Sequence, residues 1–229
     1  RARVQLEMGG KNGYLVLDDA DVAAAAAIVA TGGFGLTGQA CTATSRVIAT
    51  SAGHDRFVEA LVKEAGDWAP GDGLLPETKM GPVVDDGQLR TDLDYIGVGG
   101  AEGAELVAGG STDGLLLSPT VFAGVRPEMR IAREEIFGPV LSVMPFADEE
   151  EALRIANDAT YGLGSGVFTS RMDRALRFAT RIEAGNVWVN AYNLLHPAVP
   201  FGGYKNSGFG REGGFSGMSH FTREKSVWF

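Results

Sequence analysis

The sequence predicts an α/β fold in which a mostly parallel β-sheet is covered by helices on both faces. Short apolar segments typical of strands alternate along the chain with longer segments typical of helices. Glycine occurs 33 times in 229 residues, roughly twice its average usage, and falls mainly between the apolar segments, as it does at turns. With 45% hydrophobic residues the chain has enough apolar side chains for a large core, so disordered and collagen-like chains are excluded.

In the first third of the chain the pattern predicts strands and helices in alternation. The strands are expected at 4–6, 14–17 and 46–49, and the helices at 23–30 and 54–68. Asp18, Asp19 and Asp21 precede the alanine-rich helix and are candidates to cap it. A glycine-rich turn over 35–41 ends this helix.

The alternation continues through the rest of the chain. Helices are expected near 87–99, 148–158 and 172–182, and strands near 105–107, 120–122, 140–145, 166–169 and 186–190. A glycine-dense loop then extends to about residue 217, and a loop of this length in a compact domain is usually functional. The alternating segment 219–229 is expected to form a terminal strand that pairs with another subunit.

Composition narrows the classes of function and location. The net charge of −9 repels a phosphate backbone, so nucleic acid is not expected as a partner. A single cysteine excludes an internal disulfide framework and a cysteine-rich zinc site, and favours a reduced, cytoplasmic location. The uncharged stretch 22–45 contains too many glycines and polar residues to span a membrane, and no signal peptide precedes it. Because the chain begins at Arg1 rather than methionine, we interpret it as a piece of a longer protein.

Cys41 is the first candidate for chemistry. It follows a glycine-rich turn, where backbone N–H groups can face whatever binds the sulfur. A lone cysteine is commonly a small buried hydrophobe. The alternative is a nucleophile, which needs a base nearby and hydrogen-bond donors for the oxyanion that forms when it attacks a carbonyl.

Glu7 and two glycines form the second candidate. Glu7 stands in an apolar strand context and is followed by Gly9 and Gly10. It is either a charge on an edge strand or a carboxylate in partly apolar surroundings, where a raised pKa suits general-base work. The missing side chains of the glycines would let a ligand or another backbone segment approach.

Three further features of the sequence bear on function. Glu134 and Glu135 precede Phe137, and the pair is either a solvated cap or a binder of a ribose diol. The segment 208–213 satisfies G-x-G-x-x-G, but it neither follows a strand directly nor opens a βαβ unit, so we reject it as a dinucleotide fingerprint. The three histidines have no metal-like spacing, and no metal site is predicted.

Taken together, these segments resemble the NAD(P)-dependent aldehyde dehydrogenase superfamily. The resemblance covers essentially the whole chain and rests on separated motifs in the family's order, with Glu7 and Cys41 separated by 34 positions (41 − 7). The matching stretches are 6–12, 38–41 with Ser45 and Arg46, 134–140, and 200–205 with Ser207 and Gly208.

The resemblance implies a role for each matching residue. Cys41 would attack the aldehyde, with its own backbone N–H helping to hold the oxyanion of the thiohemiacetal. Hydride would pass to the nicotinamide of NAD or NADP, and Glu7 would deprotonate the water that hydrolyses the thioester. The implied cofactor contacts are Gly9, Glu135 and Phe137, and the implied walls of the aldehyde pocket are Leu195 and Phe201.

The resemblance also implies how the chain is organised. Residues 1–12 would end the dinucleotide-binding domain, 13–210 would form the catalytic domain, and 211–229 would return and form an oligomerisation strand of a homodimer or homotetramer. Family members are roughly twice as long, so most of the cofactor domain and an asparagine of the oxyanion hole are absent, and the piece alone is expected to be inactive. After Gln88 the sequence has Leu89, Arg90 and Thr91 where many relatives place a lysine, so that ribose contact is not assigned.

Two alternatives remain open at this point. The first is an enzyme of the same superfamily that passes the acyl group to coenzyme A, which a deacylating base at Glu7 disfavours. The second is a catalytically silent domain used for assembly, for which the expected terminal strand provides an unpaired edge.

Overall fold

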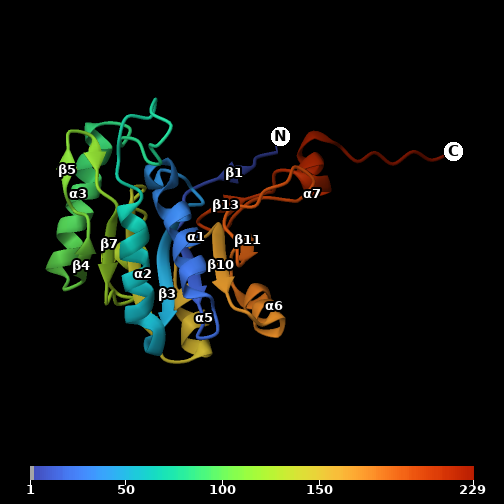
Figure 1. Cartoon of the computed structure of the whole chain (residues 1–229). Helices are drawn as coiled ribbons and strands as arrows, with labels where there is room; N and C mark the ends of the chain where they lie inside the picture. Colours follow the sequence, from blue (N-terminus) through green and yellow to red (C-terminus); the bar gives the residue numbers. More distant parts are fainter. Residues whose placement is uncertain (1–2) are drawn as a thin grey trace.

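The computed structural model describes residues 3–229, and its centre is a seven-stranded sheet (Figure 1). The strands run in the order β11-β10-β2-β3-β8-β7-β4, and every neighbouring pair is parallel except β4 with β7. Their bounds are β2 Asn12–Val16, β3 Thr44–Thr50, β4 Glu105–Ala108, β7 Thr120–Ala123, β8 Val140–Phe146, β10 Gly164–Phe168 and β11 Asn186–Val189. The predicted mostly parallel sheet is confirmed.

Helices cover both faces of this sheet, as predicted. Strand β2 shows why: Tyr14 and Val16 point into the core beneath one pair of helices, while Leu15 and Leu17 point into the core beneath the others. The first face carries α1 Val22–Phe34 and α2 His54–Gly66. The second carries α3 Asp86–Ala101, α4 Arg130–Arg133, α5 Glu149–Asn157 and α6 Met172–Arg181.

Helix α1 is longer than its alanine-rich segment predicts. Asp21 caps it, accepting a hydrogen bond from the Ala24 backbone N–H at 3.1 Å. The helix continues through Gly32 and Gly33 because tertiary packing outweighs their low helix propensity. A Cβ on Gly33 would lie 2.8 Å from the Leu141 side chain, so only glycine lets the helix pack this close to β8.

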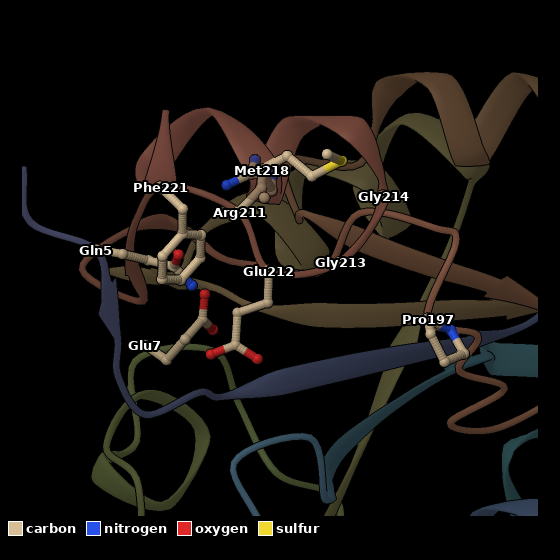
Figure 2. A pocket seen from close by; sticks show the side chains of 10 residues that line it. Gln5, Glu7, Pro197, Arg211, Glu212, Gly213, Gly214, Met218 and Phe221 are labelled. Carbon is tan, nitrogen blue, oxygen red and sulfur yellow. The ribbon is translucent and has the colours of Figure 1, made fainter. Parts of the chain in front are cut away.

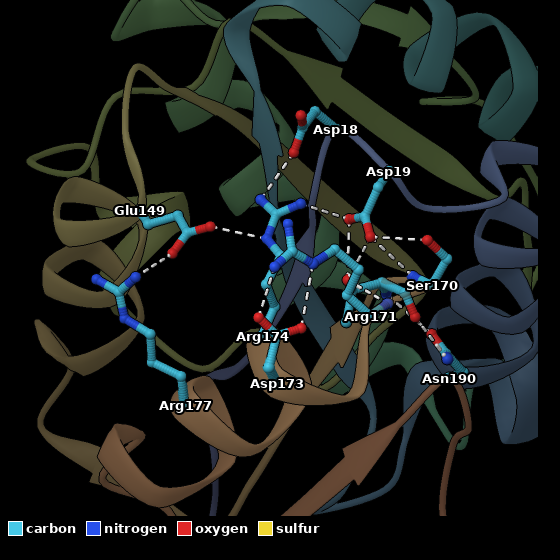
Figure 3. A network of polar contacts seen from close by, with 10 residues as sticks. Asp18, Asp19, Glu149, Ser170, Arg171, Asp173, Arg174, Arg177 and Asn190 are labelled. Carbon is cyan, nitrogen blue, oxygen red and sulfur yellow. Dashed lines mark hydrogen bonds and ion pairs between the residues drawn. The ribbon is translucent and has the colours of Figure 1, made fainter.

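The carboxyl edge of the sheet is held by a network of ion pairs around Arg174 (Figure 3). Its guanidinium contacts Asp18 at 2.7 Å, Asp19 at 2.6 Å and Glu149 at 2.8 Å. Asp18 and Asp19, expected as helix caps, therefore have another role, and only Asp21 caps α1. The network joins the turn after β2, the start of α5 and helix α6.

Several short elements lie outside the main sheet. Glycine-rich residues 202–217 are not a plain loop. They contain two short strands, each paired with a strand elsewhere in the chain, and most of a short helix. The short strands are paired as β1 Leu6–Glu7 with β13 Gly208–Phe209, β9 Tyr161–Gly162 with β12 Tyr204–Lys205, and β5 Thr112–Asp113 with β6 Leu116–Leu117. The remaining helical pieces are α7 Gly214–Met218 and the 3-10 turns Gly35–Gly38, Ser51–Gly53 and Ser219–Phe221.

Two strand predictions at the chain ends need correction. The strand expected at 4–6 is Leu6–Glu7, because only these residues pair with β13; Arg1, on which the expectation of a longer protein rests, lies outside the described residues. The terminal strand expected at 219–229 does not form within the single chain, where Ser219–Phe221 is a 3-10 turn and residues 222–229 form no strand; its pairing with another subunit stays a prediction. They extend away from the rest of the chain (Figure 1), where no neighbouring strand offers a hydrogen-bond ladder.

Candidate active site

Cys41 lies at the amino edge of the sheet, on the connection from α1 to β3. The 3-10 turn that follows α1 has residues at positive φ, among them Gly38 at 68°. A Cβ atom on Gly38 would overlap the carbonyl of Gly138, so this position needs glycine for its φ and for the close approach. The turn ends with the Cys41 side chain exposed just before β3 begins.

The surroundings of the Cys41 sulfur act on its pKa in both directions. Partial burial, the largest effect, raises the thiol pKa; the backbone N–H groups of Thr42 and of Cys41 itself lower it; and the carboxylates of Glu7 and Glu135 raise it. The net direction is upward, so the resting group at neutral pH is a thiol. The same two N–H groups are suited to an oxyanion that forms beside the sulfur.

Glu7 is held on β1, which pairs with β13 so that Glu7 lies opposite Gly208. Both of its carboxylate oxygens are buried without a hydrogen-bond partner in the described part of the chain. Burial, the largest effect, and the nearby Glu212 raise the pKa of Glu7, whereas Arg211 lowers it, and the net pKa is raised. Of the two readings of the sequence, the local environment favours a carboxylate suited to general-base work.

Glu7 faces a cavity of about 710 Å³ between the amino-terminal segment and the chain around α7 (Figure 2). Figure 2 shows the carboxylates of Glu7 and Glu212 pointing into this cavity, with Arg211 behind them and Phe221 above Glu7. The Glu7 side chain therefore forms part of the cavity wall, while its two carboxylate oxygens are themselves buried.

Glu135 reaches the same region from the loop before β8. Its Oε1 accepts a hydrogen bond from the Gly10 backbone N–H at 2.8 Å. A Cβ on Gly9 would overlap the Glu135 carboxylate, and one on Gly10 would lie 2.7 Å from the Cys41 carbonyl oxygen. The two glycines thus admit a side chain and another backbone segment, one of the two approaches that the sequence predicted.

The acidic pair that the sequence singled out separates in the fold. Glu134 faces outward, with ion-pair and hydrogen-bond contacts to Arg130 and the Tyr95 hydroxyl, both at 2.8 Å. Glu135 faces the cysteine, and Phe137, at a φ of 63°, leaves its ring 40% exposed beside it. The alternative of a solvated pair therefore describes Glu134 only, and Glu135 lies apart from it beside Gly10.

Helix α3 supports the loop that carries Glu135 and Phe137. The Gln88 amide donates to the Ile136 carbonyl at 3.0 Å and to Asp92 Oδ1 at 2.7 Å. Asp92 is fully buried, its Oδ2 has no partner among the described residues, and a Cβ on Gly138 would overlap its carboxyl group. The Gln88 side-chain amide is thus used in hydrogen bonds within the protein, where it supports the loop that carries Glu135 and Phe137.

Replacing Asp92 by asparagine is expected to stabilise the fold at neutral pH but not near pH 4. Burial, partly offset by the Gln88 hydrogen bond, raises the pKa of Asp92 from 3.8 to about 6. Because the folded carboxyl group holds its proton more tightly than the unfolded one, its stabilising contribution is complete below about pH 3.8 and is lost as the pH rises through about 6. This shift corresponds to about 3 kcal/mol at neutral pH.

Urea unfolding of the 229-residue chain and its Asp92→Asn variant, at neutral pH and near pH 4, measures the difference in their free energies of unfolding. An equal gain at the two pH values would show that packing, and not the carboxyl proton, is responsible.

Cys41 also lines a second cavity, of about 470 Å³, which does not include Glu7 in its lining. Leu195 and Phe201 line it, as expected for walls of an aldehyde pocket, together with Asn193 and His196. Glu212 borders both cavities. The fold therefore brings Leu195 and Phe201 to the cysteine, and Glu7 and Glu135 close enough to act on its pKa.

Sequence reasoning missed two residues that contact the nucleophile segment. The buried Asn12 amide donates to the carbonyls of Cys41 at 2.9 Å and Ala43 at 2.8 Å. Burial, the largest effect, raises the pKa of the partly buried Tyr192 hydroxyl, and the nearby Thr42 side chain lowers it. The available signal for Asn12 was an amide at the start of an apolar strand, since a buried amide must find partners.

The G-x-G-x-x-G segment, rejected as a dinucleotide fingerprint, has a structural use. Gly208, at a φ of 112°, lets the Leu6 carbonyl approach where a Cβ would overlap it, and so allows β13 to pair with β1.

Across residues 3–229 no group of three or more His, Cys, Asp or Glu side chains is arranged to hold a metal ion. Among the helices described, none is both long and apolar enough to cross a membrane.

Comparison with known proteins gives consistent matches. The model of the aldehyde dehydrogenase family matches residues 1–227. Betaine aldehyde dehydrogenases from Mesorhizobium japonicum and Brucella anthropi are both 44% identical, with the match covering 97% and 98% of this chain and 47% and 48% of theirs. The chain therefore spans about half the length of the curated relatives it matches.

Solved structures agree with these matches. An indole-3-acetaldehyde dehydrogenase in complex with NAD+ superposes with a TM-score of 0.96 at 44% identity, covering 99% of this chain and 47% of that one. The Staphylococcus aureus betaine aldehyde dehydrogenase in complex with NAD+ gives 0.93 at 37% identity, covering 96% and 45%.

Proposed function

Because the chain belongs to the aldehyde dehydrogenase family, we propose that it is the catalytic half of an enzyme that oxidises an aldehyde to a carboxylic acid. The observation that carries this proposal is the common cavity edge where the exposed Cys41 meets Leu195 and Phe201, with Glu7 and Glu135 near enough to raise its pKa. We include in the proposal the division into 1–12, 13–210 and 211–229, a reduced cytoplasmic location, and a homodimer or homotetramer of the full-length protein.

Cys41 is the nucleophile in this proposal. The thiol first gives its proton to water; the thiolate then adds to the aldehyde carbonyl, a C–S bond forms, and the carbonyl oxygen becomes the oxyanion of a thiohemiacetal. The N–H groups of Cys41 and Thr42, which lower the pKa of the thiol, support such an oxyanion. Leu195 and Phe201 hold the aldehyde chain in the apolar part of the cavity.

Glu7 is the general base for hydrolysis of the thioester. It takes a proton from a water molecule, the water oxygen adds to the thioester carbonyl, and the C–S bond breaks to return the Cys41 sulfur and release the acid. Its raised pKa and the cavity that its side chain lines support this role, because a buried base needs space nearby for its water.

The residues around Glu135 fit a nicotinamide cofactor. Glu135 offers carboxylate oxygens to the ribose hydroxyls, Phe137 offers an exposed ring face, and Gly9 leaves room beside the carboxylate. When bound, NAD+ or NADP+ supplies the acceptor for the hydride that leaves the thiohemiacetal carbon. We favour NAD+ because structural neighbours were solved with it. Most of the cofactor domain belongs to the part of the relatives that this chain does not span.

Two other functions make different predictions. A coenzyme A-acylating enzyme would release acyl-CoA, and the carboxylate at Glu7 argues for water as the acceptor instead. A silent assembly domain is supported by the exposed apolar side chains of the extended tail, Trp228 and Phe229. It would show neither oxidation nor a reactive cysteine.

The test follows the absorbance of reduced nicotinamide with a panel of aldehydes, for the 229-residue chain and the full-length protein side by side. We expect turnover with NAD+ in the full-length protein, a free acid as product with and without added coenzyme A, and no turnover in the shorter chain. Acyl-CoA as the product would support the acylating enzyme. No oxidation of any aldehyde by the full-length protein would support the assembly domain.

A further inference from the structure

The Asn12 side chain joins the nucleophile segment to the centre of the sheet. Its Nδ2 donates to the Cys41 carbonyl at 2.9 Å and the Ala43 carbonyl at 2.8 Å, and its Oδ1 accepts from the Gly164 N–H at 2.9 Å. Both N–H bonds of the amide are therefore used. Asn12 is 2% exposed, so these hydrogen bonds are shielded from water and from competing partners.

A hydrogen bond to the Cys41 carbonyl also fixes the N–H of the next residue. The peptide between Cys41 and Thr42 is planar and trans, so its C=O and N–H point in opposite directions. With the C=O directed at Asn12, the Thr42 N–H points the opposite way, and this N–H lowers the pKa of the Cys41 thiol. If the peptide rotated, the sulfur would lose this donor.

The surrounding backbone leaves this arrangement little freedom. A Cβ on Gly10 would lie 2.7 Å from both Asn12 Oδ1 and the Cys41 carbonyl oxygen. Gly164, which donates to Oδ1, belongs to β10, and Ala43 directly precedes β3. The amide is thus held by strands on both sides of β2.

We propose that Asn12 is a positioning residue for the nucleophile, which holds the Cys41–Thr42 peptide so that the Thr42 N–H donates to Sγ. The proposal deepens the proposed function, on which it rests only for the use made of Cys41 in catalysis. Its own readout is the chemistry of the thiol, which does not require the cofactor, an aldehyde or the other half of the enzyme.

Cys41 is the only cysteine, so its alkylation can be followed without interference. The experiment measures the rate of reaction with iodoacetamide between about pH 6 and 10 for the 229-residue chain and for Asn12→Ala. We expect the rising limb of the pH profile to move to higher pH and alkylation at neutral pH to slow about three- to tenfold, because the thiolate has lost a donor.

Asn190→Gly is the matched control. Asn190 also hydrogen-bonds a backbone N–H and C=O, those of Thr169 at 3.0 and 2.9 Å, but it lies at the carboxyl edge of the sheet, and its φ of 50° accepts glycine. A loss of stability without a change in the thiol profile is expected for it. An equal shift in Asn190→Gly would overturn the proposal, because the effect would then come from general loosening.

Asn12→Ser provides a second test in case the alanine variant does not fold, as judged by thermal unfolding. Its hydroxyl can donate to one carbonyl only, and we expect a smaller shift in the same direction. A folded Asn12 variant with an unchanged rising limb and rate would overturn the proposal. Because the thiol profile is read without turnover, this failure is distinguishable from a full-length protein that oxidises no aldehyde.

Discussion

Replacing Cys41 by serine in the full-length protein is expected to reduce aldehyde oxidation by roughly 10⁴-fold or more. The change substitutes one atom at an exposed side chain, so the fold and the cavity with Leu195 and Phe201 remain. A hydroxyl has a far higher pKa than a thiol, and no covalent adduct can form at the required rate. The measurement is the initial rate of nicotinamide reduction at saturating aldehyde.

Cys41→Ala completes this test, because it removes the nucleophile altogether. Both variants should unfold at the temperature of the parent protein and give the same low rate. Retained oxidation in a cleanly purified Cys41→Ala protein would contradict a cysteine mechanism. Cys41 would then be a structural thiol, the other interpretation that its sequence context allowed.

Replacing Glu7 by glutamine is expected to separate the two halves of the reaction. Acylation of Cys41 does not need the base for water, so the first turnover should still produce about one equivalent of reduced nicotinamide per active site. Subsequent turnover should slow by about 10²- to 10⁴-fold, the usual effect of removing a general base. Stopped-flow absorbance resolves the burst from the steady state.

The pH dependence of steady turnover is an independent test of Glu7 as the general base. Glu7 must be ionised to accept a proton, and burial raises its pKa, so steady turnover of the parent protein should fall as the pH decreases through that raised pKa. The acidic limb should be absent from Glu7→Gln. Glu128→Gln, at an exposed carboxylate paired with Arg126, is a suitable control and should behave like the parent. Unchanged steady turnover in Glu7→Gln would remove Glu7 as the base.

Periodicity and motif spacing were sufficient to predict most of the fold. The continuous apolar run 140–145 predicted β8, which is buried on both faces, and the charged, apolar-periodic segment 172–182 predicted α6, which buries one face. Motifs also identified Cys41, Glu7 and Glu135, since their residue types and neighbours are chemically distinctive. Periodicity and motifs are properties of short stretches of chain, so they can be recognised in the sequence alone.

Contacts between distant segments were decided only by the tertiary structure. Residues 219–229 alternate like a strand, yet they form none here, because a strand needs a partner for its backbone hydrogen bonds. Glu134 and Glu135 are adjacent in sequence, and only the packing of α3 and the Gly9–Gly10 segment directs one outward and the other to the cysteine.

The hydrogen bonds of Asn12 show most clearly what the sequence determined and what only the tertiary structure decided. The sequence determined that a polar amide stands at the start of a buried strand, but its partners lie 29, 31 and 152 positions away. Such pairings depend on the order in which parallel strands are placed side by side, which no local pattern encodes. The sequence by itself therefore determined the elements and the candidate site residues. The sheet order decided which backbone and carboxylate groups surround the sulfur, because that order brings the amino ends of separate strands together.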